Sequence, residues 1–253
     1  MPLSDKHVVV TGAGKGIGAA IVDALAAEGA KVSLMGRTLA PLQAKASQLP
    51  SAQAIQLDVT DSGGVKKAFQ SARDNFGPID ILINNAGQAH TSPLQSMSDE
   101  LWHDMISVNL SSVFFCCREA LSDMRKTGEG RIVNIASTAA LKGYGYVSAY
   151  CAAKHGTLGL TRSLALETAT KNITVNAVCP GYTETALIQK SIETIVEKTG
   201  RSAEEAMQTL TASNPQGRLV QPAEVANAVL WLCSPGAEAV TGQSITVAGG
   251  EVM

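Results

Sequence analysis

The sequence has few aromatic residues and almost no net charge, and each shortage excludes a class of function. Aromatic residues make up 4% of the chain, too few for a surface on which the bases of single-stranded nucleic acid stack. The 20 basic residues nearly balance the 22 acidic ones, so no positive field draws nucleic acid or anionic lipid. We therefore expect neither a nucleic-acid partner nor a membrane surface.

The cysteines and histidines lack the spacing of a disulfide framework or a metal site. The five cysteines are an odd number, and Cys116 and Cys117 are adjacent, where a bridge would be strained. The four histidines are scattered, and no cysteine pair has zinc-site spacing. The first residues do not resemble a signal peptide, and no apolar run is long enough to span a bilayer. We expect no bound metal and a cytoplasmic protein.

Short β-branched runs alternate with helical patterns along the chain, whose 45% hydrophobic content is that of a folded domain. The expected strands cover residues 8–10, 31–35, 54–57, 80–83, 131–135, 173–178 and 244–247. The expected helices cover residues 19–26, 39–49, 65–76, 99–125, 148–168 and 223–233. Strands joined through helices pair in parallel, so we predict an α/β fold: one doubly wound, Rossmann-type domain over residues 1–253, with a mainly parallel sheet of about seven strands.

One segment interrupts this alternation. Residues 184–214 are polar and only weakly amphipathic, and they follow Cys179-Pro180-Gly181 at the carboxyl end of an expected strand. Ligands of open α/β sheets bind at the carboxyl ends of the strands, so an excursion at this point is placed to cover a bound substrate. We predict that residues 184–214 form a substrate lid.

Of the 23 glycines, those in the turn from Thr11 to Gly18 give the first indication of function. This turn lies between an expected strand and an expected helix, where the pyrophosphate of a dinucleotide meets the N-terminus of the helix. The usual G-x-G-x-x-G spacing fails, because Ile17 occupies the last glycine position. The spacing that fits is Thr-Gly-x-x-x-Gly-x-Gly. We expect Gly12, Gly16, Ile17 and Gly18 at the cofactor phosphates.

The end of the second strand indicates which nicotinamide cofactor binds. A carboxylate at this turn accepts the ribose 2′-hydroxyl of NAD, but the turn here reads Met35-Gly36-Arg37. Arg37 can pair with a phosphate, and Lys15 in the glycine turn supplies a second cation. NADP(H) is therefore favoured. In the alternative interpretation both side chains are ordinary solvated charges and the cofactor is NAD.

These motifs and others along the whole chain resemble the short-chain dehydrogenase/reductase family. The further matching residues are Asp58 in Leu57-Asp58-Val59, the run Asn84-Asn85-Ala86-Gly87, the set Asn109, Ser137, Tyr150 and Lys154, and Pro180-Gly181 with Thr185. The resemblance implies a homotetramer that carries out hydride transfer. It also implies cofactor contacts from Asp58, Val59, Asn85, Ala86, Gly87, Tyr150, Lys154, Pro180, Gly181, Thr183 and Thr185. Within that set, Gly87 is expected on the adenosine side and Gly181 at the nicotinamide end.

Tyr150 is the candidate acid for this chemistry. Reduction of a ketone by hydride leaves an alkoxide that needs a proton, but free tyrosine titrates at about 10, so a nearby cation must favour the phenolate. Lys154 lies one helical turn away on the same face. Ser137 follows a strand, where its hydroxyl can polarise the substrate oxygen. Asn109 is a poor helix former among apolar neighbours, and by resemblance it anchors a water that leads from Lys154 to solvent.

The substrate pocket is expected to be walled by residues 88–94, 141–146 and 182–188. Tyr144, Tyr146, Tyr182, Leu187 and Ile188 make this wall apolar, and none of the three segments contains an arginine to bind a carboxylate. A neutral or thioester-linked ketone therefore fits better than a small keto acid. Residues 172–187, 218–222 and 240–243 resemble the ketoreductases of aromatic polyketide synthesis and their 3-oxoacyl and 3-hydroxyacyl relatives.

The resulting prediction is an NADP(H)-dependent enzyme that interconverts a ketone and a secondary alcohol, with a β-ketoacyl-type or cyclic ketone as substrate. Two alternatives stay open. The first is an NAD-dependent dehydrogenase of the 3-hydroxyacyl or hydroxybutyrate type. The second is a nucleotide-binding sensor without turnover, which loss of Tyr150 or Lys154 would favour; both residues are present.

Overall fold

The computed structural model describes residues 1–253, apart from the side chains of Leu187, Ser191, Thr194, Ile195 and Lys198. The expected pocket residue Leu187 thus lies outside the described side chains. The sheet has the order β3-β2-β1-β4-β5-β6-β7, and every pair is parallel. Its strands are β1 (His7–Thr11), β2 (Lys31–Gly36), β3 (Ala52–Gln56), β4 (Ile81–Asn84), β5 (Gly130–Ile135), β6 (Ile173–Pro180) and β7 (Ser244–Val247). The predicted fold class is confirmed, and the strand order reverses between β1 and β4, where such sheets bind ligands.

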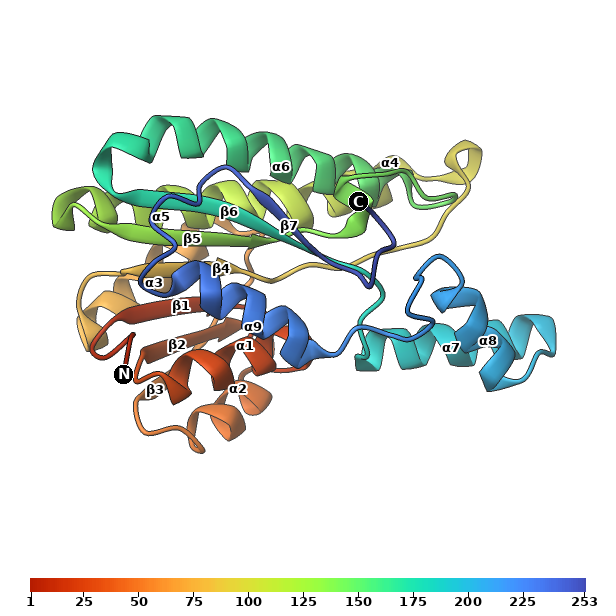
Figure 1. Cartoon of the computed structure of the whole chain (residues 1–253), viewed down its shortest axis with the longest axis horizontal. Coiled ribbons are helices and arrows are strands. Elements are labelled where there is room, and N and C mark those ends of the chain that lie inside the picture. The colour runs from red at the N-terminus through yellow and green to blue at the C-terminus, as the bar shows by residue number, and fades with distance from the viewer.

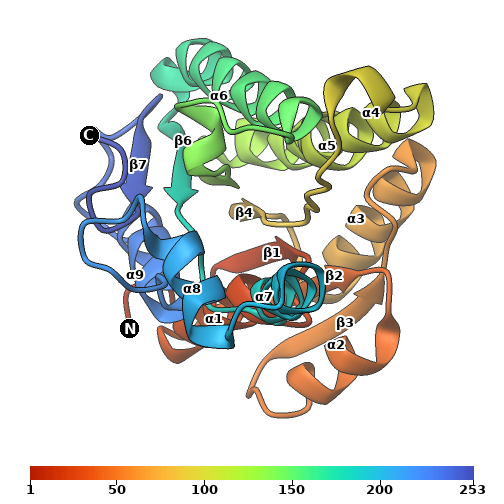
Figure 2. The same cartoon turned by 90° about the vertical axis from the view of Figure 1, so that its right-hand side faces the viewer.

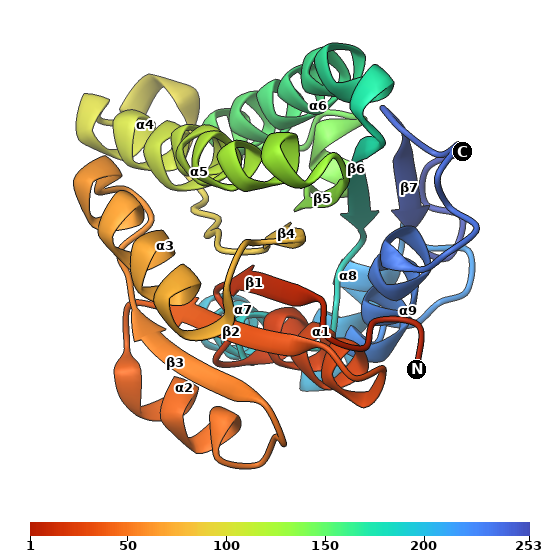
Figure 3. The same ribbon diagram turned by 90° about the vertical axis from the view of Figure 1, so that its left-hand side faces the viewer.

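Helices cover both faces of the sheet (Figures 1 and 3). One face carries α1 (Gly16–Ala27), α2 (Leu39–Ala46) and α9 (Pro222–Cys233), and the other carries α3 (Ser62–Phe76), α4 (Asp99–Ile106), α5 (Ser112–Thr127) and α6 (Ser148–Thr168). Successive strand residues point to opposite faces. Val8 and Val10 of β1 accordingly pack into the core beneath α1 and α9, whereas Val9 packs into the core beneath α3 and α5. Burial on both sides explains why this strand is an uninterrupted apolar run.

Residues 184–214 contain two helices that the sequence pattern does not predict, α7 (Ala186–Thr199) and α8 (Ala203–Thr211). Both project beyond the end of the sheet, and in Figure 2 they lie in front of it. Ser202 caps α8 in a reciprocal pair with Glu205, in which each side chain binds the other residue's backbone N–H. This Ser-x-x-Glu spacing is a sequence signal of a helix start. The polar composition of the segment masks its helical periodicity.

Other boundaries also differ from the prediction, and two of these differences have a physical cause. The expected helix 99–125 is interrupted by the π-helical turn Ser107–Ser111, which separates α4 from α5. The strand expected at 54–57 begins at Ala52 instead. β3 is the edge strand, and its partly exposed polar residues weaken the apolar pattern from which its start was predicted. Within the described chain, no helix combines the length and the apolar composition that a bilayer crossing requires.

Candidate active site

A cavity of about 860 Å³ opens beyond the carboxyl ends of β4, β5 and β6. The expected site residues that line it are Ile17, Asn85, Gly87, Asn109, Ser137, Tyr150, Lys154, Pro180, Gly181, Thr183 and Thr185. The remaining expected residues lie outside this lining: Gly12, Lys15, Gly16, Gly18, Arg37, Asp58, Val59 and Ala86. The structure thus gathers the four candidate catalytic residues in one cavity.

Backbone contacts fix the glycine turn at the edge of this cavity. A Cβ atom on Gly18 would lie 2.2 Å from the carbonyl oxygen of Gly12, so only glycine lets α1 start this close to the turn. The hydroxyl of Thr11 accepts the N–H groups of Asn85 and Ala86, both at 3.0 Å. The Asn85 amide donates in return to the carbonyl oxygens of Thr11 and Gly12. Asn85 and Ala86 therefore hold the turn in shape.

The start of α1 has the features of a phosphate site. No side chain caps the helix, and no acidic residue lies in its first turn, so its N–H groups and positive dipole end are available to an anion. Across the turn, the methyl carbon of Thr185 lies 3.2 Å from the Cβ position of Gly16. An uncapped helix start beside a close-packed glycine turn fits a dinucleotide pyrophosphate.

Two basic residues lie beyond the carboxyl ends of the neighbouring strands β1 and β2. Lys15 precedes α1 and Arg37 follows β2, and both residues are exposed. Asp58, which follows β3, accepts the N–H of Thr60 at 3.0 Å and its hydroxyl at 2.7 Å. These hydrogen bonds, together with the charge of Arg37, lower the pKa of Asp58. The carboxylate at this end thus already has partners, and the two basic side chains face solvent.

Lys154 lies at the inner end of the cavity, where it is 4% exposed. Its amine donates to the carbonyl oxygen of Ile135 at 2.8 Å and lies 5.7 Å from the centre of the Tyr150 ring. Burial lowers the pKa of Lys154 to about 8. A large part of the lysine population therefore loses its charge within one pH unit above neutrality.

Tyr150 differs from the expectation in one respect. We expected Lys154 to lower the pKa of the phenol, but burial raises the pKa of Tyr150 and the hydrogen bond to Ser137 opposes that shift. The amine of Lys154 donates instead to the carbonyl oxygen of Ile135. Ser137 is itself oriented, since its hydroxyl accepts the N–H of Ala139 at 3.1 Å. Tyr150 is therefore a protonated hydroxyl near neutral pH.

Asn109 is fully buried in the π-helical turn, a distortion that is frequent at functional sites. Its amide donates to the carbonyl oxygen of Gln88 at 2.9 Å, and its side-chain oxygen accepts the N–H of Gln88 at 3.2 Å. Its own carbonyl oxygen accepts the hydroxyl of Thr157. A Cβ atom on Gly87 would lie 2.9 Å from Asn109 Oδ1 and 3.6 Å from Lys154 Nζ. Gly87 thus lies beside Asn109 and Lys154 in the cavity, and its expected place on the adenosine side of the cofactor stays a prediction.

Comparisons with known proteins agree with this geometry. A family model described as short chain dehydrogenase matches residues 6–195. The chain belongs to this family. It is 38% identical to the 3-oxoacyl-acyl-carrier-protein reductase FabG of Escherichia coli over the whole of both chains. It is equally identical to the D-beta-hydroxybutyrate dehydrogenase of Cupriavidus necator over 99% of both. A crystal structure of a variant of actinorhodin polyketide ketoreductase with NADPH matches at a TM-score of 0.94, with 38% identity and 98% of each chain covered.

These matches confirm the expected family. The expected wall of the substrate pocket is found in part. Tyr144, Tyr182 and Ile188 line the cavity, whereas Tyr146 is 67% exposed and lies outside the lining. The hydroxyl of Tyr144 donates to the carboxylate of Glu251 at 2.5 Å. The sequence reasoning missed Glu251, because 107 positions separate it from Tyr144 and no motif marks it.

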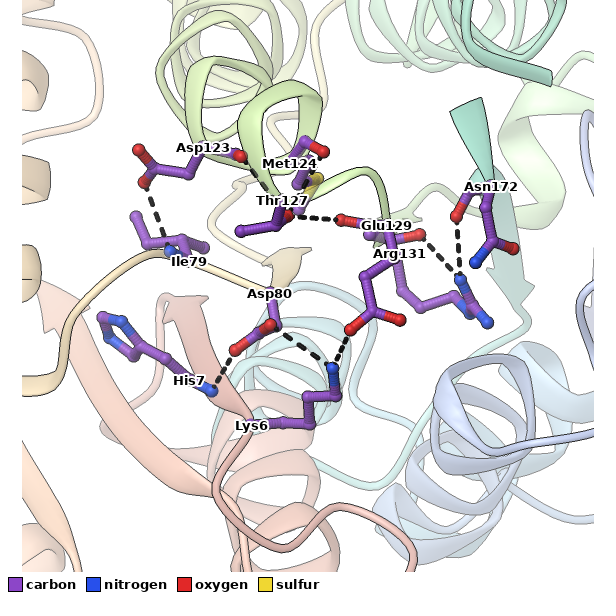
Figure 4. A network of polar contacts seen from close by, with 11 residues as sticks. Lys6, His7, Ile79, Asp80, Asp123, Met124, Thr127, Glu129, Arg131 and Asn172 are labelled. Atoms are coloured by element: carbon purple, nitrogen blue, oxygen red, sulfur yellow. Dashed lines mark hydrogen bonds and ion pairs between the residues drawn. The ribbon is translucent and has the colours of Figure 1, made fainter. Parts of the chain in front are cut away.

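Two titratable residues near the motifs, Asp80 and His155, make structural contacts outside the catalytic set. Asp80 accepts the backbone N–H of His7 at 2.8 Å and pairs with Lys6 at the amino ends of the strands, away from the cavity (Figure 4). Lys6 also pairs with Glu129 there. The ring of His155 bonds the carbonyl oxygen of Cys151 in the preceding turn of α6.

Proposed function

We propose that the protein is an NADP(H)-dependent ketoreductase that interconverts a ketone and a secondary alcohol, with a β-ketoacyl-type or cyclic ketone as substrate. The observation that carries this proposal is the convergence of Ser137, Tyr150 and Lys154 in one cavity beside an uncapped glycine turn. The names of the relatives support the same chemistry, since they include a 3-oxoacyl reductase and a polyketide ketoreductase solved with NADPH.

The choice of NADP(H) rests on the positions of Lys15 and Arg37. A hydroxybutyrate dehydrogenase and a 3-oxoacyl reductase are both 38% identical to the chain, so overall identity does not separate a dehydrogenase of that type from a reductase. The local charges do separate them, because a guanidinium and an ammonium stabilise a 2′-phosphate and offer no acceptor to a 2′-hydroxyl. The alternative of an NAD-dependent dehydrogenase is therefore less well supported.

The proton chemistry falls to Tyr150 and Ser137. When bound, the nicotinamide supplies the hydride. Ser137 donates a hydrogen bond to the substrate oxygen, and Tyr150, whose raised pKa keeps it protonated, gives that oxygen its proton. Lys154 is charged below a pH of about 8; it passes a proton to the phenolate left on Tyr150 and takes up another from solvent. Asn109 supports this end of the cavity by holding the backbone of Gln88 on both sides.

The cavity wall supports a neutral or thioester-linked ketone. None of the described side chains that line the cavity belongs to an arginine, which is the usual partner of a substrate carboxylate. Thr185, Ile188 and Leu210 line the cavity from the segment 184–214, which supports a lid role for that segment. A homotetramer agrees with the apolar residues exposed on α5 and α6, Phe114 and Leu166.

Substitution of Tyr150 by phenylalanine tests the mechanism. The variant keeps the ring and its packing but loses the hydroxyl, so kcat for ketone reduction should fall about 100-fold to 10,000-fold. The dissociation constant for NADPH, measured by fluorescence titration, should stay within about twofold because the glycine turn is untouched. Retention of wild-type kcat by Tyr150→Phe would exclude the phenol as the proton donor.

A further inference from the structure

A buried carboxylate that the reaction does not use lies against the substrate cavity. Glu251 follows β7, and its side chain is 1% exposed. One oxygen, Oε1, accepts the hydroxyl of Tyr144 at 2.5 Å and that of Ser213 at 2.7 Å, and it pairs with the amine of Lys142 at 3.1 Å. Buried charges are retained only where such partners compensate their desolvation.

These contacts join three parts of the substrate site that are distant in sequence. Tyr144 lines the cavity, and its hydroxyl lies 2.7 Å from that of Thr138, the neighbour of the catalytic Ser137. The Tyr144 ring also meets the Tyr182 ring edge to face, with 6.5 Å between centres. Ser213 lies just beyond α8, at the end of the segment 184–214. Glu251 is therefore the common partner of the cavity wall and of the segment that covers it.

The backbone that delivers Glu251 is closely fitted to the same segment. Gly249 and Gly250 have φ angles of +59° and +90°, a conformation that favours glycine. A Cβ atom on Gly249 would lie 2.1 Å from the side-chain oxygen of Asn214. On the other side, Glu251 Oε2 lies 3.0 Å from the Cβ position of Gly181, which lines the cavity. Any larger residue at Gly249 would therefore clash with Asn214, at the end of the same segment.

The charge state of Glu251 makes the contact to Tyr144 a strong one. Burial opposes ionisation of the glutamate, but the hydrogen bonds from Tyr144, Ser213 and Lys142 outweigh it and lower the pKa of Glu251. Burial and the bond to Glu251 both raise the pKa of Tyr144. A neutral phenol thus donates to an ionised carboxylate, and bonds of this kind are about twice as strong as neutral ones.

We propose that Glu251 is a positioning residue of the substrate site, which fixes the ring of Tyr144 in the cavity wall and thereby sets the preference for bulky cyclic ketones over short acyclic ones. The inference rests on the proposed ketoreductase function. Tyr144 lines the same cavity as Ser137 and Tyr150, so we expect a two-ring ketone bound at those two residues to contact its ring, whereas a short β-keto ester needs only Ser137 and Tyr150. Release of the ring therefore weakens binding of the larger ketone selectively.

The test compares kcat/KM for tetralone and for ethyl acetoacetate, with NADPH, in Glu251→Gln, Tyr144→Phe and the double variant. Each single variant should lower the tetralone-to-ester ratio about tenfold, chiefly through KM for tetralone. The double variant should show no further loss, because Glu251→Gln removes the charge from the contact that Tyr144→Phe removes altogether. Glu238→Gln is the matched control. Glu238 lies in the loop before β7, pairs with Arg131 of β5 and does not line the cavity.

A ratio within twofold of wild type in both single variants would overturn the inference, and so would additive losses in the double variant. Tyr144→Phe keeps the ring and decides the question even if Glu251→Gln does not fold. A wild-type protein that reduces neither ketone with NADPH, while binding NADPH, would instead contradict the proposed function. The two failures are therefore distinguishable.

Discussion

The cofactor-binding half and the substrate-binding half of the site are built in different ways. The proposed cofactor half consists of two short continuous segments, Thr11 to Gly18 and Asn84 to Gly87, which are joined by hydrogen bonds of 3.0 Å between the side chains of Thr11 and Asn85 and the backbone. The substrate half is assembled from side chains far apart in the sequence, such as Tyr144, Ser213 and Glu251. Backbone geometry leaves the first half little tolerance for change. The second half can change its shape through single side chains.

Gly18→Ala is the most disruptive way to break the cofactor half. The added methyl would lie 2.2 Å from the Gly12 carbonyl oxygen, and neither backbone segment can move away without opening the turn. We expect the free energy of unfolding, measured in urea, to fall by about 3 kcal/mol, together with loss of NADPH binding. A variant that binds NADPH with wild-type affinity would show that the turn is not the phosphate site.

Gly63→Ala is the control for this substitution. Gly63 lies in the first turn of α3, and a Cβ atom there would meet nothing closer than 3.4 Å. Alanine is the better helix former, so stability should stay unchanged or rise by up to about 1 kcal/mol. If Gly63→Ala lost as much stability as Gly18→Ala, the loss would reflect the replacement of any glycine and not the close contact at Gly18.

Arg37→Asp sharpens the comparison, because it changes cofactor choice and leaves the substrate half untouched. A carboxylate after β2 repels the 2′-phosphate and accepts the 2′-hydroxyl, so the ratio of kcat/KM for NADPH over NADH should fall about 100-fold. Arg125→Asp, at the far end of α5, is the control of equal charge change. If wild-type protein already uses NADH as well as NADPH, Arg37 does not select the cofactor.

A change of pH should have a smaller effect on the reaction, through Lys154 and Tyr150, which lie where the two halves meet. Burial lowers the pKa of Lys154 to about 8, whereas it raises that of Tyr150, so the lysine loses its proton first as pH rises. We expect kcat/KM for ketone reduction to fall above pH of about 8, by tenfold per pH unit at the limit. A profile that stays flat to a pH of about 10 would contradict a catalytic role for the charged amine.

Stability should change in the opposite direction. The folded-state pKa of Lys154 lies below the usual value of 10.5, so the unfolded chain binds the extra proton between these two values. The contribution of this lysine to the free energy of unfolding therefore rises as pH increases from about 8 to about 10. Urea unfolding of wild type and Lys154→Met across that range measures it, and the difference between the two proteins should change in this sense.

The same division decides how much the sequence predicts. The parallel sheet of about seven strands, the glycine turn and the catalytic set follow from continuous motifs and from family resemblance, and the predicted bounds of β7 are the observed ones. The polar composition of residues 184–214 predicts no helix, although Ser202 and Glu205 have the spacing that starts α8. The position of Gly87 and the role of Glu251 depend on contacts between distant segments. No local pattern encodes such contacts.

The most direct test of the account is a cofactor-consumption screen of the purified protein. β-Ketoacyl thioesters, cyclic ketones and sugars are each supplied with NADPH and with NADH, and oxidation is followed by absorbance. The account predicts ketone-dependent consumption of NADPH, with higher kcat/KM than for NADH and the highest values among the β-ketoacyl and cyclic ketones. Binding of NADPH with no consumption for any ketone would contradict it and favour a nucleotide-binding sensor.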